Sequence, residues 1–413
     1  MTAVSNSPKL ERRLGLTGLA ATGICSMLGA SIYIVPFMIQ RNVEGIGHYV
    51  IWAFVFAALP AIFAAVAYAS LSSAMPVAGG SYIYASRGLN PYLGFIASFS
   101  QWFGLSIAIG VIAYVIVPFF RDIATVMHWD LTVNFLEQGL NRVIISILLL
   151  WSFVAVNVLG LELYKHTLVP MMVFMFVLGA LVIVVGYSNN HQDFYQALTI
   201  EAPATLEISG NFDIKTFLSA AAVLFASFIG FDSIAQAGSE AKNPRRNLPL
   251  AIIITICAVG IFYLLFTSAV YHTVPWTYVY EQSIIKDVTA PGLLSPVLSS
   301  SMAALIILGA AVALVNDLPA MLLSVSRLMF AWASDGIFPA FVARVHPLFH
   351  TPYSALILSG VVATIGILGS HFAGDFFLGV DIMVTSMLVN FMLMCLTLAF
   401  IYRKNQTIAK RIY

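Results

Sequence analysis

Charged residues are scarce in this chain of 413 residues. Aspartate, glutamate, lysine and arginine make up 9% of it and hydrophobic residues 60%, whereas a water-soluble domain carries about 25% charged residues. A chain with so little charge cannot present a polar surface to water on all sides. The composition therefore predicts an integral membrane protein. The formal net charge of +1 gives no indication of a nucleic-acid partner.

Cysteine and histidine are also few. The three cysteines, Cys25, Cys257 and Cys395, lie in separate apolar stretches, and the eight histidines show no metal-binding spacing. The sequence contains no recognisable pair of nucleophile and base and no phosphate-binding loop. These absences predict a protein that is not an enzyme and that holds no metal or cofactor.

Long apolar runs are what the sequence has in abundance. A run of about 20 residues is long enough to cross a bilayer, and we expect ten spans. They lie at approximately 15–40, 48–73, 91–119, 142–160, 167–187, 215–240, 248–272, 296–331, 352–370 and 376–402. The expected fold class is an all-α integral membrane protein with ten transmembrane helices, forming one domain over residues 1–413.

The distribution of basic residues predicts the orientation. Of the 19 lysines and arginines, only five fall at one set of span ends. These five are Arg41, Arg121, Arg142, Lys215 and Lys286. The others lie at the opposite set, which by the positive-inside rule faces the cytoplasm. Both termini are then cytoplasmic, as an even number of spans requires, and we expect the protein in the cell's inner membrane.

Two of the expected spans are interrupted by small residues. The first contains "GICSMLGAS" and the sixth contains "ASFIGFDS" around Gly230. Interrupted segments at corresponding positions of two halves indicate a transporter site. At such a break, half-helix N-termini attract an anionic group, and unwound carbonyls accept from a cation. The alternative is tight helix packing, since small residues let two backbones approach.

Three segments resemble one transporter family. "FASFIGFDSIAQAGSEAKNPRRNLPLAI" resembles the sixth-helix signature of the amino acid–polyamine–organocation (APC) transporters. "ICSMLGASIYIVP" resembles their first-helix break, and "RLMFAWASDGIFPAFVARV" is similar to their eighth-helix exit. The resemblance implies a 5+5 inverted-repeat fold with discontinuous helices 1 and 6, alternating access, and repeats at approximately 15–187 and 215–402.

The resemblance also implies a substrate site at the two breaks. A substrate carboxylate is expected at Gly29, Ala30 and Ser31. The ammonium is expected on carbonyls near Met27, Phe225, Ala226 and Phe228, beside the break at Gly230. Ile109 and Ile112 are expected to supply apolar walls. Some proton-coupled relatives carry a lysine midway along helix five, and this chain has none there.

Two carboxylates are expected near the middle of the membrane. Asp232 and Asp317 each lie ten residues before a basic residue at the cytoplasmic edge, Lys242 and Arg327 respectively. Ten helical residues span about 15 Å, half of a hydrocarbon core of about 30 Å. An ionised carboxylate is costly at that depth. Both are therefore candidates for proton coupling, and the alternative for each is a structural, hydrogen-bonded acid.

The function expected from these features is secondary transport of amino acids or related amines, coupled to protons. Its expected partners are a small-molecule substrate and the lipid bilayer. Four alternatives stay open: an uncoupled exchanger, a sodium-coupled transporter, a transporter of polyamines or cationic amines, and a non-transporting sensor. The sequence leaves the oligomeric state open.

The orientation can be tested with epitope tags. We predict that tags at the N-terminus and at the C-terminus are both inaccessible to antibody in intact cells and become accessible after permeabilisation. The reason is the excess of lysine and arginine at one set of span ends. A C-terminal tag that is labelled from outside would mean an odd number of spans.

Overall fold

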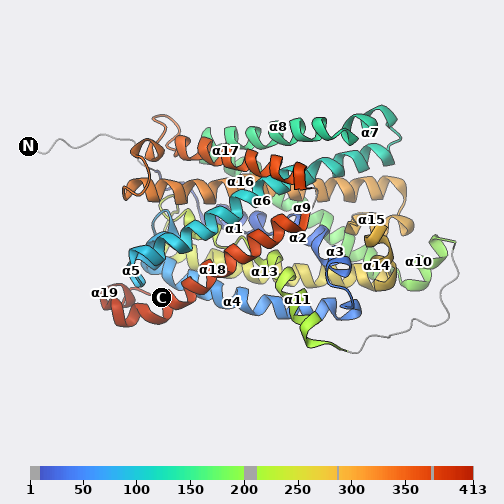
Figure 1. The fold of residues 1–413 in the computed structure, drawn as a ribbon, viewed down its shortest axis with the longest axis horizontal. Coiled ribbons are helices and arrows are strands. Elements are labelled where there is room, and N and C mark those ends of the chain that lie inside the picture. The colour runs from blue at the N-terminus through green and yellow to red at the C-terminus, as the bar shows by residue number, and fades with distance from the viewer. Residues whose placement is uncertain (1–9, 200–211, 286–287, 374–375, 413) are drawn as a thin grey trace, which may run out of the picture.

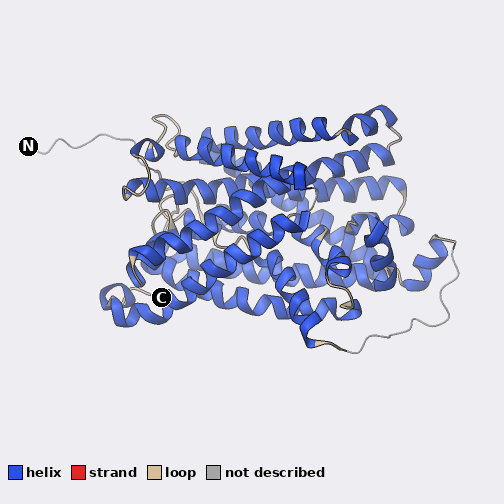
Figure 2. Ribbon diagram, viewed as in Figure 1, coloured by secondary structure: helices blue, strands red, loops and turns tan. Residues whose placement is uncertain are grey.

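The computed structural model describes residues 10–199, 212–285, 288–373 and 376–412. These residues form helices joined by turns and loops, and none of them belongs to a β-strand (Figure 2). The longest helices run along the long axis of the molecule and pack side by side (Figure 1). The expectation of an all-α protein is confirmed for the described part of the chain.

Nine helical segments in the described residues are long and apolar enough to cross a membrane. Eight of them are continuous helices: α4 (Val50–Ala74), α6 (Pro91–Val126), α8 (Gly139–Val158), α9 (Leu161–Ser188), α13 (Pro244–Thr273), α16 (Ser300–Ser334), α17 (Tyr353–Ala373) and α18 (Phe376–Lys404). The ninth, Ile214–Gln236, is assembled from shorter pieces. These segments agree with nine of the ten spans expected from the apolar runs.

The first expected span is divided into three helices. They are α1 (Leu16–Met27), α2 (Ala30–Tyr33) and α3 (Val35–Asn42). The 12 residues of α1 extend about 18 Å, which is too short to cross a core of about 30 Å. The helix ends because Leu28 has φ −86° and ψ 78°, outside the helical region. Pro36 stands in the first turn of α3. Backbone N–H groups there have no partner within the helix, so proline loses no helical hydrogen bond at this position.

The sixth expected span is divided as well. It consists of α11 (Ile214–Leu224), the 3₁₀ turn η2 (Phe225–Phe228) and α12 (Ser233–Gln236). Between η2 and α12, Ile229 is extended and Gly230 has φ 136°, a conformation that favours glycine. A Cβ at Gly230 would also overlap the Ser26 carbonyl of α1. The second interruption therefore packs directly against the first helix.

Short helices lie at both ends of the bundle (Figure 1). One end carries α5 (Gly80–Gly88) and α19 (Gln406–Ala409), and the other carries α7 (Asp130–Glu137), α10 (His191–Ala197), α14 (Trp276–Ile285) and α15 (Ala290–Leu294). The remaining pieces are the 3₁₀ turns η1 (Gly47–Tyr49), η3 (Ser295–Val297) and η4 (Ala340–Ala343). The long helices make up the part of the molecule between these ends.

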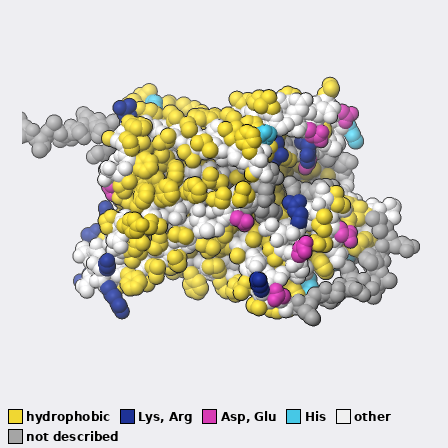
Figure 3. All heavy atoms as spheres, in the orientation of Figure 1, with side chains coloured by type: hydrophobic (Ala, Val, Ile, Leu, Met, Phe, Trp, Pro, Cys, Tyr) yellow, Lys and Arg dark blue, Asp and Glu magenta, His cyan; other side chains and the backbone are white. Residues whose placement is uncertain are grey.

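The outer surface is apolar along the long helices. Large hydrophobic side chains such as Trp52, Phe63 and Leu148 are about two-thirds exposed. Figure 3 shows hydrophobic side chains across the middle of one face, with most charged side chains towards the two ends. A water-soluble protein rarely exposes so large an apolar area. This surface suits a bilayer, where lipid tails cover it.

One end of the bundle is held together by a buried ion pair. Arg327 of α16 donates from Nε and Nη2 to the two carboxylate oxygens of Glu240, over 3.0 and 2.6 Å. Both side chains are almost fully buried. Beside this pair, Leu14 forms backbone hydrogen bonds with Glu240 and Lys242, over 2.9 and 2.7 Å. The segment before α1 is thereby fixed to the segment before α13.

We predict that Arg327→Met destabilises the protein by about 3–5 kcal/mol, because Glu240 is left buried without its partner. Thermal unfolding in detergent would measure the change. Arg327→Lys is expected to lose most of the same stability, because lysine cannot make the two parallel hydrogen bonds. The double variant Arg327→Met/Glu240→Gln, which removes both charges, should recover part of it. If the Arg327→Met protein unfolds at the same temperature as the wild type, the ion pair does not stabilise the fold as proposed.

Candidate functional site

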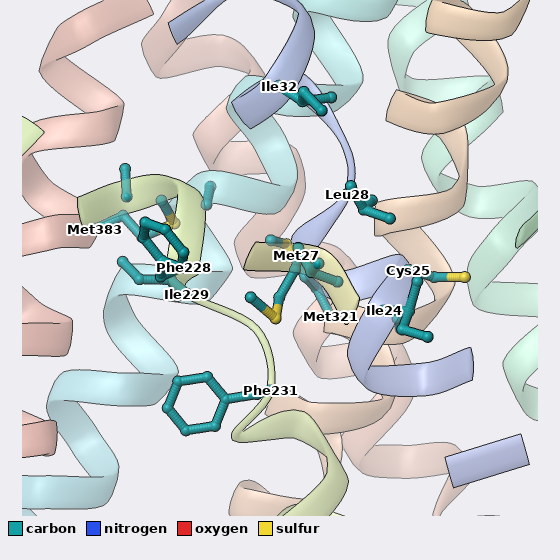
Figure 4. Close-up of a cluster of buried hydrophobic side chains, with 14 of the residues drawn as sticks. Ile24, Cys25, Met27, Leu28, Ile32, Phe228, Ile229, Phe231, Met321 and Met383 are labelled. Atoms are coloured by element: carbon teal, nitrogen blue, oxygen red, sulfur yellow. The ribbon is translucent and has the colours of Figure 1, made fainter. Parts of the chain in front are cut away.

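The two interrupted spans meet in the middle of the molecule. The Ser26 hydroxyl at the end of α1 lies 3.0 Å from the Ser233 hydroxyl at the start of α12. Figure 4 shows the unwound chain after Met27 beside the unwound chain that leads to Phe231. An irregular backbone at membrane depth is tolerated only where protein covers it or where it lines a cavity. The contact between the two breaks satisfies that condition.

A small cavity lies at this meeting point. Its volume is about 30 Å³, small beside the roughly 300–1,000 Å³ of a typical ligand pocket. It is bounded by α1, α3, α6, the η2 turn, α16 and α18. The lining residues are Ser26, Val35, Ala108, Val111, Ile112, Ala226, Ile229, Asp317, Met321, Gly379, Val380 and Met383. A typical small-molecule ligand therefore fits only if these walls move apart.

Among the described residues that line this cavity, Asp317 is the one that carries a charge. Its side chain is buried, and it projects from α16 against the backbone of Gly29, since a Cβ at Gly29 would overlap the carboxyl group. The neighbouring Asn316 donates to the Cys25 sulfur over 2.8 Å. Residues 316 and 317 of α16 therefore lie against the end of α1 and against the interruption that follows it.

Asp232 has different surroundings. Its Oδ1 accepts from the Gly230 N–H over 3.1 Å, and its Oδ2 accepts from the Gln101 side-chain amide. Gln101 in turn accepts from Ser81 over 2.6 Å and from Gln236 over 2.9 Å. Asp232 is buried and does not line the cavity. The carboxyl group is thus a hydrogen-bonded part of the second break and lies outside the cavity lining.

The Met27 carbonyl, expected to receive an ammonium, already has donors. The Tyr263 hydroxyl donates to it, and so does the Gly29 N–H, over 3.2 Å. The Ala226 carbonyl likewise accepts from the Ile229 N–H over 3.2 Å. These two carbonyl groups of the unwound segments therefore already accept hydrogen bonds from within the protein.

The predicted site residues other than Asp232 fall into three groups. Ile112, Ala226 and Asp317 line the cavity. Met27, Gly29, Ile109, Phe225, Phe228 and Gly230 are buried around it without lining it. Ala30 and Ser31 form the start of α2, and their side chains lie outside the described residues.

The two phenylalanines of the second break support its shape. Phe225 packs against Phe391, with ring centroids 5.8 Å apart. Phe228 packs against Phe54 at 5.3 Å and against Tyr263 at 5.9 Å. Their rings therefore fill the space behind the break, while the η2 turn presents the small side chain of Ala226 to the cavity.

Several lining residues were not found from the sequence. On α6 the lining positions are Ala108, Val111 and Ile112. Their spacing of three and four residues puts them on one face of the helix. The predicted residue Ile109 follows Ala108 directly and therefore points away from this face. Given Ile112 as one position of the face, helical periodicity could have predicted the position four residues before it. Gly379, Val380 and Met383 of α18 carry no motif, and the apolar pattern alone does not separate a wall of a cavity from a face towards lipid.

The comparison with known families decides the class of protein. The model of the family described as "Amino acid permease" matches residues 14–413. The chain belongs to the amino acid permease family. The matched residues include both interrupted spans, the residues that line the cavity, and the buried pair Glu240 and Arg327. The resemblance to APC transporters is thus confirmed, and as a permease the chain is an integral membrane transporter and not an enzyme.

Similar permeases differ in what their names say they carry. The chain is 26% identical to the methylthioribose transporter of Bacillus subtilis, over 89% of this chain and 77% of that protein. It is also 26% identical to the branched-chain amino acid permease BcaP of the same organism, over 88% and 76%. An uncharacterised transporter of Mycobacterium tuberculosis is 27% identical, over 86% and 74%.

We predict that Gly29→Ala weakens ligand binding about tenfold or more, because its Cβ would displace the Asp317 carboxyl group and overpacking of this kind costs about 1–3 kcal/mol. Gly29→Leu should abolish binding. The matched control is Gly369→Ala in α17, where a Cβ would have no neighbour within 4 Å. Calorimetric titration of the purified permease would measure both. Normal affinity in a folded Gly29→Ala protein would falsify the placement of the site.

Proposed function

We propose that this permease is a secondary active transporter of amino acids or related amines, that it works by alternating access, and that it is coupled to protons. The observation that carries the proposal is the meeting of two interrupted spans at one small cavity. Secondary transporters bind their substrates at such places, near the middle of the bilayer. In the proposed site the ligand lies between the breaks at Met27–Ser31 and Phe225–Gly230, against the wall formed by Ile112.

The proposed architecture has ten spans in two inverted repeats, at approximately 15–187 and 215–402. Two observations support it. The nine long segments and the divided first span together make ten. The two divided spans are the first of each proposed half, as an inverted repeat requires. Both termini are proposed to be cytoplasmic, which the excess of basic residues at that end supports.

A wide cleft supports alternating access. It has a volume of about 1090 Å³ and is lined by residues that include Arg12, Val77, Ser239 and Arg344. These residues neighbour the segment of Leu14 and Glu240, where backbone pairing and the Glu240–Arg327 ion pair hold the bundle closed. We propose that the cleft is the cytoplasmic vestibule, and that this closed layer separates it from the cavity. Opening the layer would release substrate inwards.

The rival proposal is an uncoupled exchanger. The observation that favours it is the absence of a lysine midway along α9, whose one lysine is Lys165 near its start. Some proton-coupled relatives carry such a lysine, so this chain would need another group. The names of similar proteins do not separate the substrates, because a methylthioribose transporter and a branched-chain amino acid permease are equally similar.

We propose Asp232 as the proton-responsive group. It lies at the second break and its two oxygens accept from Gly230 and Gln101. Gain or loss of one proton would therefore rearrange the hydrogen bonds that shape the break. The carboxylate form satisfies both donors, whereas the neutral acid must turn one oxygen into a donor. In this way the charge of Asp232 would favour one conformation over another.

We predict that Asp232→Asn still binds and exchanges substrate, because the amide oxygen keeps an acceptor at the break. It should lose the acceleration of uptake by an inward proton gradient, because it has no titratable group. The measurement is uptake of labelled amino acids and amines into proteoliposomes, with and without a pH gradient. Asp122→Asn, whose carboxylate lies beside Arg121 at the surface, is the control.

The opposite outcome is equally informative. An Asp232→Asn permease that still concentrates substrate when driven by a pH gradient would make Asp232 a structural acid. Asp317 would then be the next proton-coupling candidate. If the wild type itself shows exchange and no response to the gradient, the uncoupled exchanger is the correct function.

A further inference from the structure

The chemistry of the cavity wall restricts what can bind there. Besides Asp317, the described lining residues include one other side chain with a hydroxyl or amide group, Ser26, whose hydroxyl is engaged with Ser233. The rest of the described lining is apolar, and none of it is lysine, arginine or histidine. The wall therefore offers negative charge and apolar surface. It offers no cationic side chain with which a ligand carboxylate could pair.

The position of the Asp317 carboxyl group further disfavours a ligand that carries a carboxylate. It packs on Gly29 at the interruption of the first span, which is where the resemblance to APC transporters places the carboxylate of a substrate. A ligand carboxylate bound there would meet a second carboxylate in a buried, mostly apolar site. Like charges at such a site repel strongly, because little water is present to screen them.

We infer that the site selects a small apolar monoamine that lacks a carboxylate. This inference rests on the proposed function, in which the cavity is the transport site. The ammonium of the ligand pairs with Asp317, which takes the place of the substrate's own carboxylate at the interruption. The apolar body of the ligand lies against Ile112, Met321 and Met383.

The same wall disfavours polyamines. A second ammonium at the far end of a diamine would face apolar residues such as Val111, Ile229 and Val380, with no second carboxylate among the described lining residues. Asp232 is the nearest alternative acid on the sixth span, but it lies outside the lining and already accepts from two donors. A buried charge without a partner is costly. One ammonium therefore fits the site and two do not.

A set of five ligands, four of which carry the side chain of leucine, tests the inference on the wild-type permease. The set is 3-methylbutylamine, leucine, leucine methyl ester, 3-methylbutanol and 1,5-diaminopentane, titrated calorimetrically into the purified full chain. We expect 3-methylbutylamine to bind about tenfold or more tightly than leucine. The methyl ester, whose carboxylate is neutralised, should bind between them. The alcohol and the diamine should bind more weakly than the monoamine.

A pair of variants tests the role of Asp317. Asp317→Asn should weaken binding of 3-methylbutylamine about tenfold or more and should reduce the difference between this amine and leucine. The control is Asp381→Asn, which follows the lining residue Val380 on α18 but has an exposed side chain; it should bind both ligands as the wild type does. If Asp317→Asn does not fold, the comparison of ligands on the wild type still tests whether the site selects a monoamine without a carboxylate.

Leucine binding as tightly as 3-methylbutylamine to the wild type would overturn the inference, as would equal binding of the alcohol or tighter binding of the diamine. Flux of the labelled ligands into proteoliposomes separates the two proposals. Uptake of leucine without uptake of the amine overturns the substrate inference and leaves the transporter. Tight binding of the amine at this site with no flux of any ligand overturns the proposed function and leaves the binding site.

Discussion

Backbone amide and carbonyl groups must find partners when a helix is interrupted inside hydrocarbon, because no water is present to replace the lost hydrogen bonds. The structure meets this requirement by placing its two interruptions against each other. Tyr263 and Gly29 donate to the Met27 carbonyl, and Asp232 accepts from the Gly230 N–H. The long helices around them form the cover that keeps these bonds away from lipid.

The same requirement explains where the chain tolerates charge. Glu240 and Arg327 are buried as a pair with two parallel hydrogen bonds, so that neither charge is left without its partner. Asp232 is held by two donors within the second break. Asp317 differs from both because it lies on the wall of the cavity, where its surroundings change when the walls move. The permease thus buries one pair of opposite charges, one acid held by hydrogen bonds at the second break, and one acid on the wall of the cavity.

Much of this could be predicted from the sequence because the relevant signals are local. Apolar runs predicted nine of the spans, and the small residues after Cys25 and around Gly230 predicted both interruptions. The long apolar runs on both sides of Asp317 predicted that it is buried. The contact of Asp317 with Gly29 could not be predicted, because it joins residues 288 positions apart and depends on how α16 is rotated about its axis. The Gln101–Asp232 hydrogen bond and the lining from α18 depend on packing in the same way.

Three thioether side chains gather near the interruptions, as Figure 4 shows for Met27, Met321 and Met383. Methionine is unbranched and polarizable, so its side chain takes different shapes at little cost and still makes good contacts. Of these, Met321 and Met383 line the cavity, so this part of its wall can follow the outline of what occupies it. The branched residues of the lining, Val35, Val111, Ile112, Ile229 and Val380, are stiff at χ1. The lining thus combines side chains of fixed shape with two that adapt, and a change in the outline of the cavity is expected first at Met321 and Met383.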